Sequence, residues 1–273
     1  MKMSPSVSLL LLLLLGLSQA NPIQEEISGE GPLQEEDIED EVNDDTVDIG
    51  TRILMSNNAT DETLLEGDLL APKTRNAIRC WSQSCMWRKA RNGQVVVPFA
   101  ISGQFSSYER QTIERAMRGF HSSTCIRFVP RGRERDFLSI ESRGGCFSAL
   151  GRSGGMQVLS INKQGCMYHG IIQHEIIHAL GFQHEQTRSD RDGYVKINWQ
   201  NMNRAMAYNF HKQNTNNLNT PYDYSSIMHY GRTAFSINGR DTITPIPNAN
   251  TRIGQRRGMS GWDVKRINLL YRC

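Results

Sequence analysis

Apolar residues between positions 94 and 161 occur in short runs that are separated by polar, glycine-containing turns. This pattern is typical of β-strands. The predicted strands are residues 94–101, 126–129, 137–140 and 156–161. Pro98 lacks a backbone N–H, so it places the first strand near a sheet edge or a bulge.

Helical periodicity appears in three other places. Ser106 and Glu109 have the spacing of a capping box, and apolar residues follow at helical spacing at Ile113, Ala116, Met117 and Phe120. The pattern becomes helical again after Gly170, and residues 261–271 resemble a closing helix. Residues 198–224 are rich in Asn and Gln, which predicts loops and short helical pieces. The expected fold class is α+β: a mixed sheet with helices, followed by a largely irregular lower half.

The first 20 residues have the pattern of an export signal. Lys2 precedes an unbroken apolar run from Leu9 to Leu15, and Ala20 ends a small-x-small cleavage site. The run is too short to span a bilayer, and no other stretch approaches that length. We therefore expect a secreted protein without membrane insertion, and residues 1–20 to be removed.

Charge divides the rest of the chain into two parts. Residues 21–75 hold 16 acidic against 3 basic residues, whereas residues 76–273 hold 12 acidic against 27 basic, a net charge of +15. The boundary carries Lys73 and Arg75, so a trypsin-like protease could cut between Arg75 and Asn76. An acidic pro-segment over a catalytic domain, residues 76–273, is the simplest interpretation; a plain acidic tail is the alternative. Asn58 begins a glycosylation motif within the acidic part.

Six cysteines occur, and none precedes residue 80. In an oxidising compartment this even number predicts three disulfides, for which fifteen pairings are possible.

The segment 174–184, HEIIHALGFQH, carries the chemistry. His174 and His178 are one helical turn apart, so both imidazoles can bind one ion. Gly181 can end the helix in a left-handed conformation, which returns His184 as a third nitrogen ligand. Three imidazoles plus a water form an open catalytic zinc site, with one zinc ion per chain.

Glu175 lies beside this set and can act as the general base. Zinc lowers the pKa of a bound water from 15.7 towards about 7, and Glu175 can take the proton as the water attacks a peptide carbonyl. Chance would produce this spacing on the order of once in 10⁵ chains of this length. The rival zinc-peptidase arrangement uses a downstream glutamate as third ligand, but Glu185 is the last glutamate in the chain.

The pentapeptide Ser226 to Tyr230, SIMHY, adds two candidates. Met228 could form an apolar floor beneath the histidines, and the phenol of Tyr230 could reach the metal or a developing oxyanion. For three of the remaining histidines, His121, His169 and His211, we expect ordinary surface or capping roles. His229 lies within the pentapeptide, but by itself it would indicate no special role.

Together, HExxHxxGxxHE and SxMHY resemble the astacin family of the metzincins over residues 76–273. The resemblance implies a zincin-like fold, the zinc ligands His174, His178 and His184, Glu175 as base, and Tyr230 as a displaceable fifth ligand. It also implies a contact between Glu185 and the matured N-terminus. Because this N-terminus is longer than the family minimum, that contact is the least direct inference.

The resemblance also implies a disulfide framework. The two usual pairs of the family fall on Cys125–Cys273 and Cys146–Cys166, which leaves Cys80 and Cys85 as a local pair. This extra pair is similar to the six-cysteine subgroup typified by the egg-hatching enzymes of bony fishes.

Pro-segments of the family inhibit through the aspartate of an F-x-G-D motif. Here Leu65-Glu66-Gly67-Asp68 matches only the Gly-Asp part, and Asp68 is assigned as the latch on the zinc. A cysteine latch is excluded, because no cysteine precedes residue 80.

The expected function is hydrolysis of extracellular proteins by a monomeric zinc endopeptidase, activated by a trypsin-like protease. An egg coat is the leading substrate, and storage in secretory zymogen granules before release is expected. A digestive, immune or tissue-remodelling protease of the same subgroup is the alternative. A zinc-holding binding module or basic matrix protein would have a damaged ligand set or base, and neither is damaged here. Nothing in the sequence indicates nucleic-acid binding.

Overall fold

The strands expected between residues 94 and 161 are all present in a computed structural model of the chain. The structure describes residues 47–58, 60–71, 84–255 and 257–273. The expected signal peptide, most of the acidic runs and the Arg75–Asn76 cleavage site lie outside these residues.

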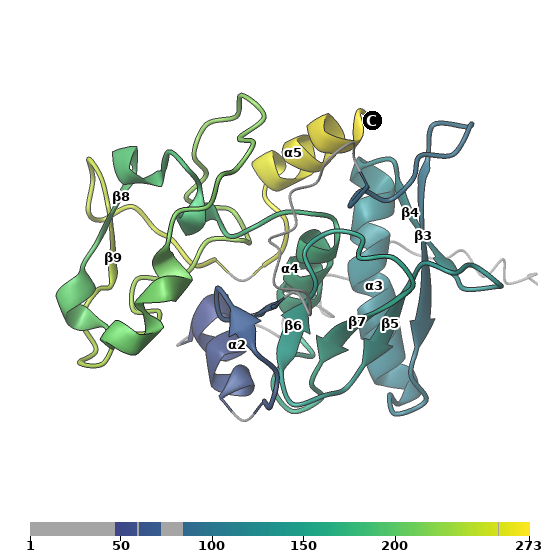
Figure 1. Cartoon of the computed structure of the whole chain (residues 1–273), viewed down its shortest axis with the longest axis horizontal. Helices are drawn as coiled ribbons and strands as arrows, with labels where there is room; N and C mark the ends of the chain where they lie inside the picture. The colour runs from purple at the N-terminus through teal and green to yellow at the C-terminus, as the bar shows by residue number, and fades with distance from the viewer. Residues whose placement is uncertain (1–46, 59, 72–83, 256) are drawn as a thin grey trace, which may run out of the picture. The chain divides into compact units, whose positions relative to one another are not determined.

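The main sheet of the described residues has seven strands in the order β1-β2-β6-β7-β5-β3-β4, in which β1 is Leu64–Leu65 and β2 is Leu69–Leu70. Figure 1 labels the other five. Four of them are the predicted strands, and their pairing is parallel: β3 (Val95–Ile101), β4 (Ile126–Pro130), β5 (Phe137–Glu141) and β7 (Met156–Ile161). Strand β6 (Cys146–Ser148) pairs antiparallel with β7. Its three residues were too few for a periodic pattern to predict it.

Pro98 lies in β3, directly beside the edge strand β4, so the strand is near a sheet edge, as predicted. The register of the sheet explains how a proline is tolerated in a strand that has neighbours on both sides. Pro98 pairs with Val129 of β4, whereas pairing with β5 begins only at Phe99. The missing N–H of Pro98 therefore falls just before the second neighbour begins, where it interrupts no ladder.

Helix α3 (Ser107–Ser123) has the predicted capping box. The Ser106 hydroxyl accepts from the Glu109 N–H at 3.3 Å, and a Glu109 carboxylate oxygen accepts from the Ser106 N–H at 2.7 Å. All four predicted apolar positions of this helix are buried in the main core. They pack against the sheet and against the next helix, α4.

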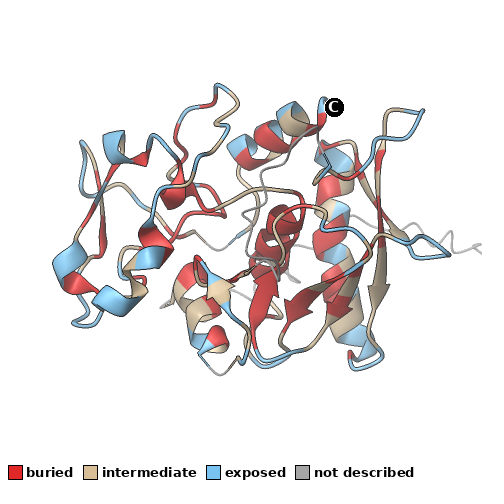
Figure 2. Ribbon diagram, in the orientation of Figure 1, coloured by how far each residue is buried: buried red, intermediate tan, exposed pale blue. Residues whose placement is uncertain are grey.

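Helix α4 (His169–Ala179) is buried along almost its whole length, as the red ribbon in Figure 2 shows. Its first turn begins before the predicted Gly170. Leu180 ends the helix, and Gly181 adopts a φ of 105°, which lets the chain reverse as predicted. Side chains from distant segments satisfy the last carbonyls: Trp87 Nε1 donates to Ala179 O at 2.8 Å, and the Tyr271 hydroxyl donates to Leu180 O at 2.9 Å.

The second half of the chain is largely irregular, as predicted. It contains four short 3-10 helices and a two-stranded antiparallel sheet of β8 (Val195–Ile197) and β9 (Ile243–Pro245). These elements surround a separate hydrophobic cluster that includes Phe210, Tyr222 and Tyr230. Helix α5 (Gly261–Tyr271) closes the fold and spans the residues that the sequence predicted.

Two disulfides tie the described chain together. Cys125 and Cys273 join the start of β4 to the C-terminus with a Cα–Cα distance of 5.4 Å, and Cys146 and Cys166 join β6 to the loop before α4. The Cys146–Cys166 bond fixes the loop between β7 and α4 beside β6. The third expected pair involves Cys80, which lies outside the described residues.

Residues 47–58 and 60–71, called the N-terminal segment below, fold against the rest of the described chain. The segment contains α2 (Ile49–Asn57), β1 (Leu64–Leu65) and β2 (Leu69–Leu70), and β2 extends the sheet by pairing parallel with β6. Ile49 and Ile53 are buried in the main core. Within the described residues, no helix has the length and apolarity needed to cross a membrane.

Candidate metal centre

Three histidine side chains converge at the C-terminal end of α4. Neighbouring turns of the helix present His174 and His178, whose Nε2 atoms are 3.1 Å apart. The reversal at Gly181 returns His184, whose Nε2 lies 3.2 Å from that of His174. All three side chains are buried. The structure therefore places the three predicted ligands together.

The outer nitrogen of each imidazole has its own partner. His174 Nδ1 lies 2.9 Å from Ile227 O, and His178 Nδ1 lies 2.7 Å from Phe182 O. His184 Nδ1 lies 3.0 Å from a carboxylate oxygen of Glu66. Because each partner is an acceptor, each Nδ1 carries the proton and each Nε2 points a lone pair inward.

Three inward lone pairs at this spacing cannot satisfy one another, since none of the Nε2 atoms then has a proton to donate. A metal ion removes the conflict. With Zn–N bonds of about 2.0–2.1 Å, tetrahedral ligands have nitrogens roughly 3.3 Å apart, close to the 3.1 and 3.2 Å of His174 with its two neighbours. The donor set fits zinc.

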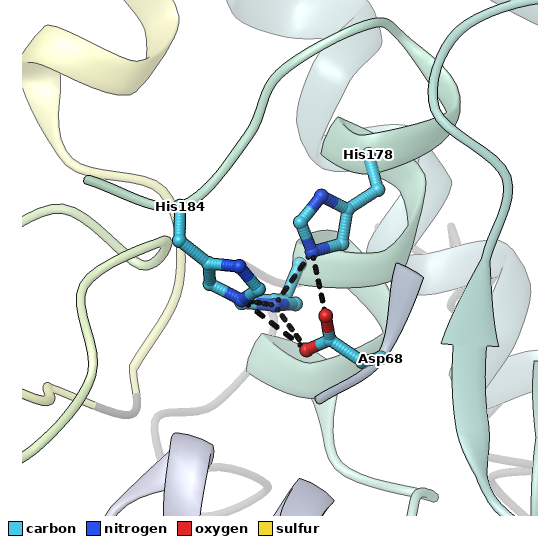
Figure 3. A group of neighbouring side chains, drawn as sticks. Asp68, His178 and His184 are labelled. Atoms are coloured by element: carbon cyan, nitrogen blue, oxygen red, sulfur yellow. Dashed lines mark hydrogen bonds and ion pairs between the residues drawn. The ribbon is translucent and has the colours of Figure 1, made fainter. Parts of the chain in front are cut away.

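Asp68 supplies a fourth donor from the N-terminal segment. One carboxylate oxygen lies 3.1 Å from His174 Nε2 and 3.2 Å from His184 Nε2, and the other lies 3.3 Å from His178 Nε2. Figure 3 shows the carboxylate pointing at the imidazoles of His178 and His184. The four potential ligand atoms lie within 4.8 Å of one another, all buried.

Burial alone would raise the pKa of Asp68. When the inward nitrogens bear protons in place of an ion, the charges of His184 and His178 and the hydrogen bonds donated by His174 and His178 outweigh burial and hold the pKa of Asp68 well below its usual value. Asp68 is therefore an ionised carboxylate facing a cationic centre.

The conformation of the turn between β1 and β2 directs the Asp68 side chain towards the three histidines. Glu66 and Gly67 both have positive φ, 49° and 84°, and Asp68 follows directly. A Cβ on Gly67 would lie 2.5 Å from Leu54 Cδ2 and 2.8 Å from the Tyr230 hydroxyl. Only glycine fits both the conformation and the space at this position.

Glu175 is buried next to the first ligand, and neither of its carboxylate oxygens has a hydrogen-bond partner in the described structure. Burial, followed by the negative charge of Asp68, raises the pKa of Glu175 well above its usual value. A buried carboxylate without a hydrogen-bond partner lowers the stability of the fold, so its presence here indicates a functional role. Its position and raised pKa suit a general base.

The segment 226–230 passes directly beneath the site. Ile227 O accepts the proton of His174 Nδ1, and Met228 O accepts from the Glu185 N–H at 3.0 Å. Met228 itself is buried in the main core. His229 is also buried, and its ring lies between the Tyr222 hydroxyl at 2.8 Å and the carbonyl of Tyr230 at 2.7 Å.

The hydroxyl of Tyr230 donates to the carbonyl oxygen of Glu66. Its ring centroid is 4.5 Å from that of His184, so the phenol lies at the edge of the metal centre. Burial, followed by the negative charge of Asp68, raises the pKa of Tyr230 well above its usual value. In this structure the N-terminal segment holds the predicted fifth ligand.

Glu66 is a site residue that the sequence analysis missed. Besides His184 Nδ1, its carboxylate accepts from the His184 N–H at 3.3 Å and from the Thr187 hydroxyl at 3.2 Å. The only feature of the sequence that could have indicated a role for Glu66 was its position two residues before Asp68. Nothing in the composition of this acidic region distinguishes Glu66 from the other acids around it.

Glu185 makes contacts that the sequence did not predict. Two nitrogens of Arg266 donate to its two oxygens at 2.6 and 2.9 Å, and Arg188 and the Asp223 N–H donate as well. Burial raises the pKa of Glu185 although both arginines oppose the rise. The expected partner, the matured N-terminus at Asn76, lies outside the described residues.

The other singled-out residues lie away from the centre. His121 Nε2 accepts from the Phe128 N–H at 2.9 Å, which is an ordinary structural role. His211 is exposed at the end of a 3-10 helix, and His169 begins α4. Asn58 is exposed just after α2, where a glycan could attach.

Three imidazoles leave one coordination position of a zinc ion for another oxygen ligand, and a buried, unpaired glutamate lies beside it. Structural zinc sites have four permanent protein ligands, whereas hydrolytic sites keep one position exchangeable. Here the fourth donor comes from a separate segment at the sheet edge. The fold and the site together define a zinc-dependent peptidase.

Comparison with known proteins identifies the group. Residues 83–272 match the peptidase family Astacin. The chain is 64% identical to high choriolytic enzyme 1 of Oryzias latipes over 274 residues, covering all of both chains, and 50% identical to the low choriolytic enzyme of that fish, again over all of both. A solved structure of high choriolytic enzyme 1, described as a hatching enzyme zinc-protease, matches with a TM-score of 0.70 and 68% identity, covering 72% of this chain and 100% of that one.

The chain belongs to the astacin family, and it is a zinc metalloendopeptidase. The predicted α+β metzincin fold and the zinc cofactor are thereby confirmed.

Proposed function

We propose that this protein is a secreted hatching protease, made as a latent precursor, which hydrolyses egg-envelope proteins. Its full-length similarity to choriolytic enzymes supports the substrate. One observation supports the latency above all others: Asp68 occupies the space in front of the three histidines. The precursor is held inactive by that carboxylate until the N-terminal segment leaves.

Latency in this proposal rests on three contacts of one short turn. Asp68 fills the fourth ligand position, Glu66 holds His184 in place, and the Glu66 carbonyl binds the Tyr230 hydroxyl. Asn57 fastens the turn to the sheet, because its amide donates to Gly67 O at 2.8 Å and to Cys146 O at 2.7 Å. A substrate cannot enter while this turn is in place.

Activation is proposed to follow cleavage between Arg75 and Asn76 by a trypsin-like protease. The signal peptide, residues 1–20, is removed on export, and the pro-segment, residues 21–75, leaves with Asn58 and any glycan on it. Residues 76–273, with the three disulfides Cys80–Cys85, Cys125–Cys273 and Cys146–Cys166, remain as the active enzyme. We expect a monomer that is stored in secretory granules before release.

When bound, zinc supplies a Lewis acid that polarises a water molecule and the scissile carbonyl. Glu175 accepts a proton from the attacking water, whose oxygen bonds to the carbonyl carbon. The Glu175 carboxyl then returns the proton to the leaving nitrogen as the C–N bond breaks, so acid and base are one residue.

Tyr230 is proposed to act once Glu66 has left. Its hydroxyl then has no carbonyl acceptor, and it can donate to the oxyanion that forms at the scissile carbonyl. The ordinary pKa of a tyrosine, about 10, keeps the hydroxyl protonated and able to donate at neutral pH.

The substrate part of the proposal is tested with isolated egg envelopes. The activated enzyme should release soluble fragments from intact envelopes, and Glu175→Gln at equal concentration should release none. A general digestive or immune protease would cleave denatured casein and serum proteins well but leave the envelope intact. That result would reject the hatching role while leaving the peptidase chemistry in place.

A further inference from the structure

The C-terminal helix α5 contacts the metal centre's supports at three separate points. Asp263 contacts the segment 226–230, Arg266 binds Glu185 directly after the third histidine, and the Tyr271 hydroxyl binds the last turn of α4. Each contact is a hydrogen bond to a segment that holds or orients a zinc ligand. Figure 1 shows α5 lying above α4, at the border between the sheet and the irregular half.

Asp263 has more partners than helix capping requires. As the third residue of α5 it completes a capping box, with its carboxylate accepting from the Ser260 N–H at 2.9 Å. The same carboxylate also accepts from the Ser226 hydroxyl at 2.6 Å and from the Ile227 N–H at 2.9 Å. The residue is 4% exposed, so all three bonds form away from solvent.

A second capping box in the same molecule provides the comparison. Glu109 has the same position in α3, but it is only partly buried, and its carboxylate binds only the Ser106 N–H among the described residues. Capping alone therefore needs neither full burial nor extra partners. Burying a carboxylate is costly, which indicates that the two additional bonds of Asp263 have another purpose.

Those bonds lead to a zinc ligand in two steps. Asp263 accepts from the backbone N–H of Ile227, and the carbonyl of the same residue accepts the Nδ1 proton of His174 at 2.9 Å. The tautomer and direction of His174 depend on where that carbonyl points. The direction of that carbonyl depends on the backbone conformation of Ile227, whose N–H Asp263 holds in place.

We propose that Asp263 is a positioning residue of the zinc site, which orients His174 through the backbone of Ile227. The proposal rests on the three-histidine zinc site and needs no assumption about the substrate. Arg266 supports it from the next turn of α5, because its bidentate bond to Glu185 fixes the chain beside His184. The C-terminal helix thus holds the first and third ligands in one rigid arrangement.

The test compares Asp263→Asn with Glu109→Gln in the uncleaved chain. Both changes replace a capping carboxylate by an amide, but only the first puts an N–H donor where Ser226 and Ile227 already donate. Zinc affinity is measured by competition with a chromophoric chelator. Asp263→Asn should weaken it about tenfold, the usual effect of losing an outer partner of a metal ligand. Glu109→Gln should leave it unchanged.

A cobalt-substituted chain gives a second measurement. The visible absorption of Co²⁺ reports ligand geometry, so Asp263→Asn should shift the bands, whereas Glu109→Gln should give the wild-type spectrum even if it melts at a lower temperature. Wild-type affinity and an unchanged spectrum in Asp263→Asn would overturn the proposal.

If Asp263→Asn does not fold, Ser226→Ala gives a second test with little change in size. It removes the bond from the Ser226 hydroxyl to Asp263, together with the bond that this hydroxyl accepts from the Met228 N–H at 3.0 Å. Weaker zinc binding in Ser226→Ala supports the proposal, and unchanged binding rejects it. Because the measurement is metal affinity, either result is independent of whether the chain cleaves egg-envelope proteins.

Discussion

A carboxylate oxygen of Asp68 lies 3.1 Å from Nε2 of His174, although 106 residues separate the two in the chain. The contact joins the turn between β1 and β2 to helix α4, which carries two of the three predicted zinc ligands and the predicted general base. It places an anionic side chain where a hydrolytic zinc site needs an exchangeable position. The carboxylate that is proposed to keep the precursor inactive therefore occupies the coordination position that catalysis needs.

The first prediction concerns that contact. In a chain made uncleavable by Arg75→Ala, Asp68→Ala should raise the hydrolysis of a short peptide about a hundredfold, the lower end of what tethering a ligand contributes. The exposed Asp61→Ala is the matched control and should stay silent. If Asp68→Ala hydrolyses the peptide no faster than the control does, steric cover by the N-terminal segment, and not the carboxylate, keeps the precursor inactive.

Removing zinc should also destabilise the fold. A bound ion stabilises the folded state, because a ligand present at a hundred times its dissociation constant contributes about 3 kcal/mol. Chelation should therefore lower the melting temperature by roughly 5 to 10 °C. Added zinc should restore it, and added magnesium should not, because magnesium prefers oxygen ligands. An unchanged melting temperature after verified zinc loss would contradict the site.

His121 should make stability depend on pH. Burial, helped by the charges of Arg127 and Arg118, lowers its pKa below 6.5, since the neutral ring accepts from the Phe128 N–H. This contribution is fully present above about pH 6.5 and is lost as the pH falls through the lower pKa of the folded state.

The melting temperature of wild type should therefore fall more between pH 7.5 and pH 5.5 than that of His121→Gln, whose amide oxygen can accept at any pH. Equal falls in the two proteins would show that the ring does not titrate differently in the folded state.

The charge of the proposed mature enzyme gives a further prediction. Residues 76–273 carry a net charge of +15, which should concentrate the enzyme on an acidic coat by an attraction that salt weakens. Raising salt from about 0.02 M to about 0.5 M shortens the Debye length from roughly 20 Å to roughly 4 Å. Envelope solubilisation should drop strongly, while cleavage of a small neutral peptide should change little.

Charge reversal at Arg133 and Arg135 provides the variant for this test. Both are exposed and form no ion pair with any described residue. The double change to Glu should weaken envelope binding at low salt and leave peptide cleavage as it was. Equal salt sensitivity of envelope and peptide would leave contacts near the active cleft as the source of substrate choice.

The sequence predicted the parts of the fold that have a strong local pattern. The capping box at Ser106, the boundaries of α5 and the strand 156–161 were all predictable, because each follows from short-range spacing. Strand β6 and the β8–β9 pair were not, since strands of three residues depend on their partners rather than on their own periodicity. The same reason explains Pro98, whose tolerance depends on where β5 begins.

In the metal centre, too, features set by short-range spacing were predictable and contacts between distant segments were not. The histidines and Glu175 lie in one motif, so their meeting was predictable from helix geometry. Glu66 and Asp263 were missed because their contacts span 118 residues to His184 and 36 to Ile227. A buried hydrogen bond between distant segments leaves no periodic signal, and only the folded chain shows it.

Glu175→Gln tests the central claim most directly. The three imidazoles are untouched, so zinc content and the cobalt spectrum should match wild type, but no carboxylate can take the proton from the attacking water. After cleavage at Arg75, we predict full zinc occupancy and a loss of peptide hydrolysis of at least about a thousandfold. Activity within tenfold of wild type, with zinc bound, would contradict the assignment of Glu175 as the general base and with it this account of the enzyme.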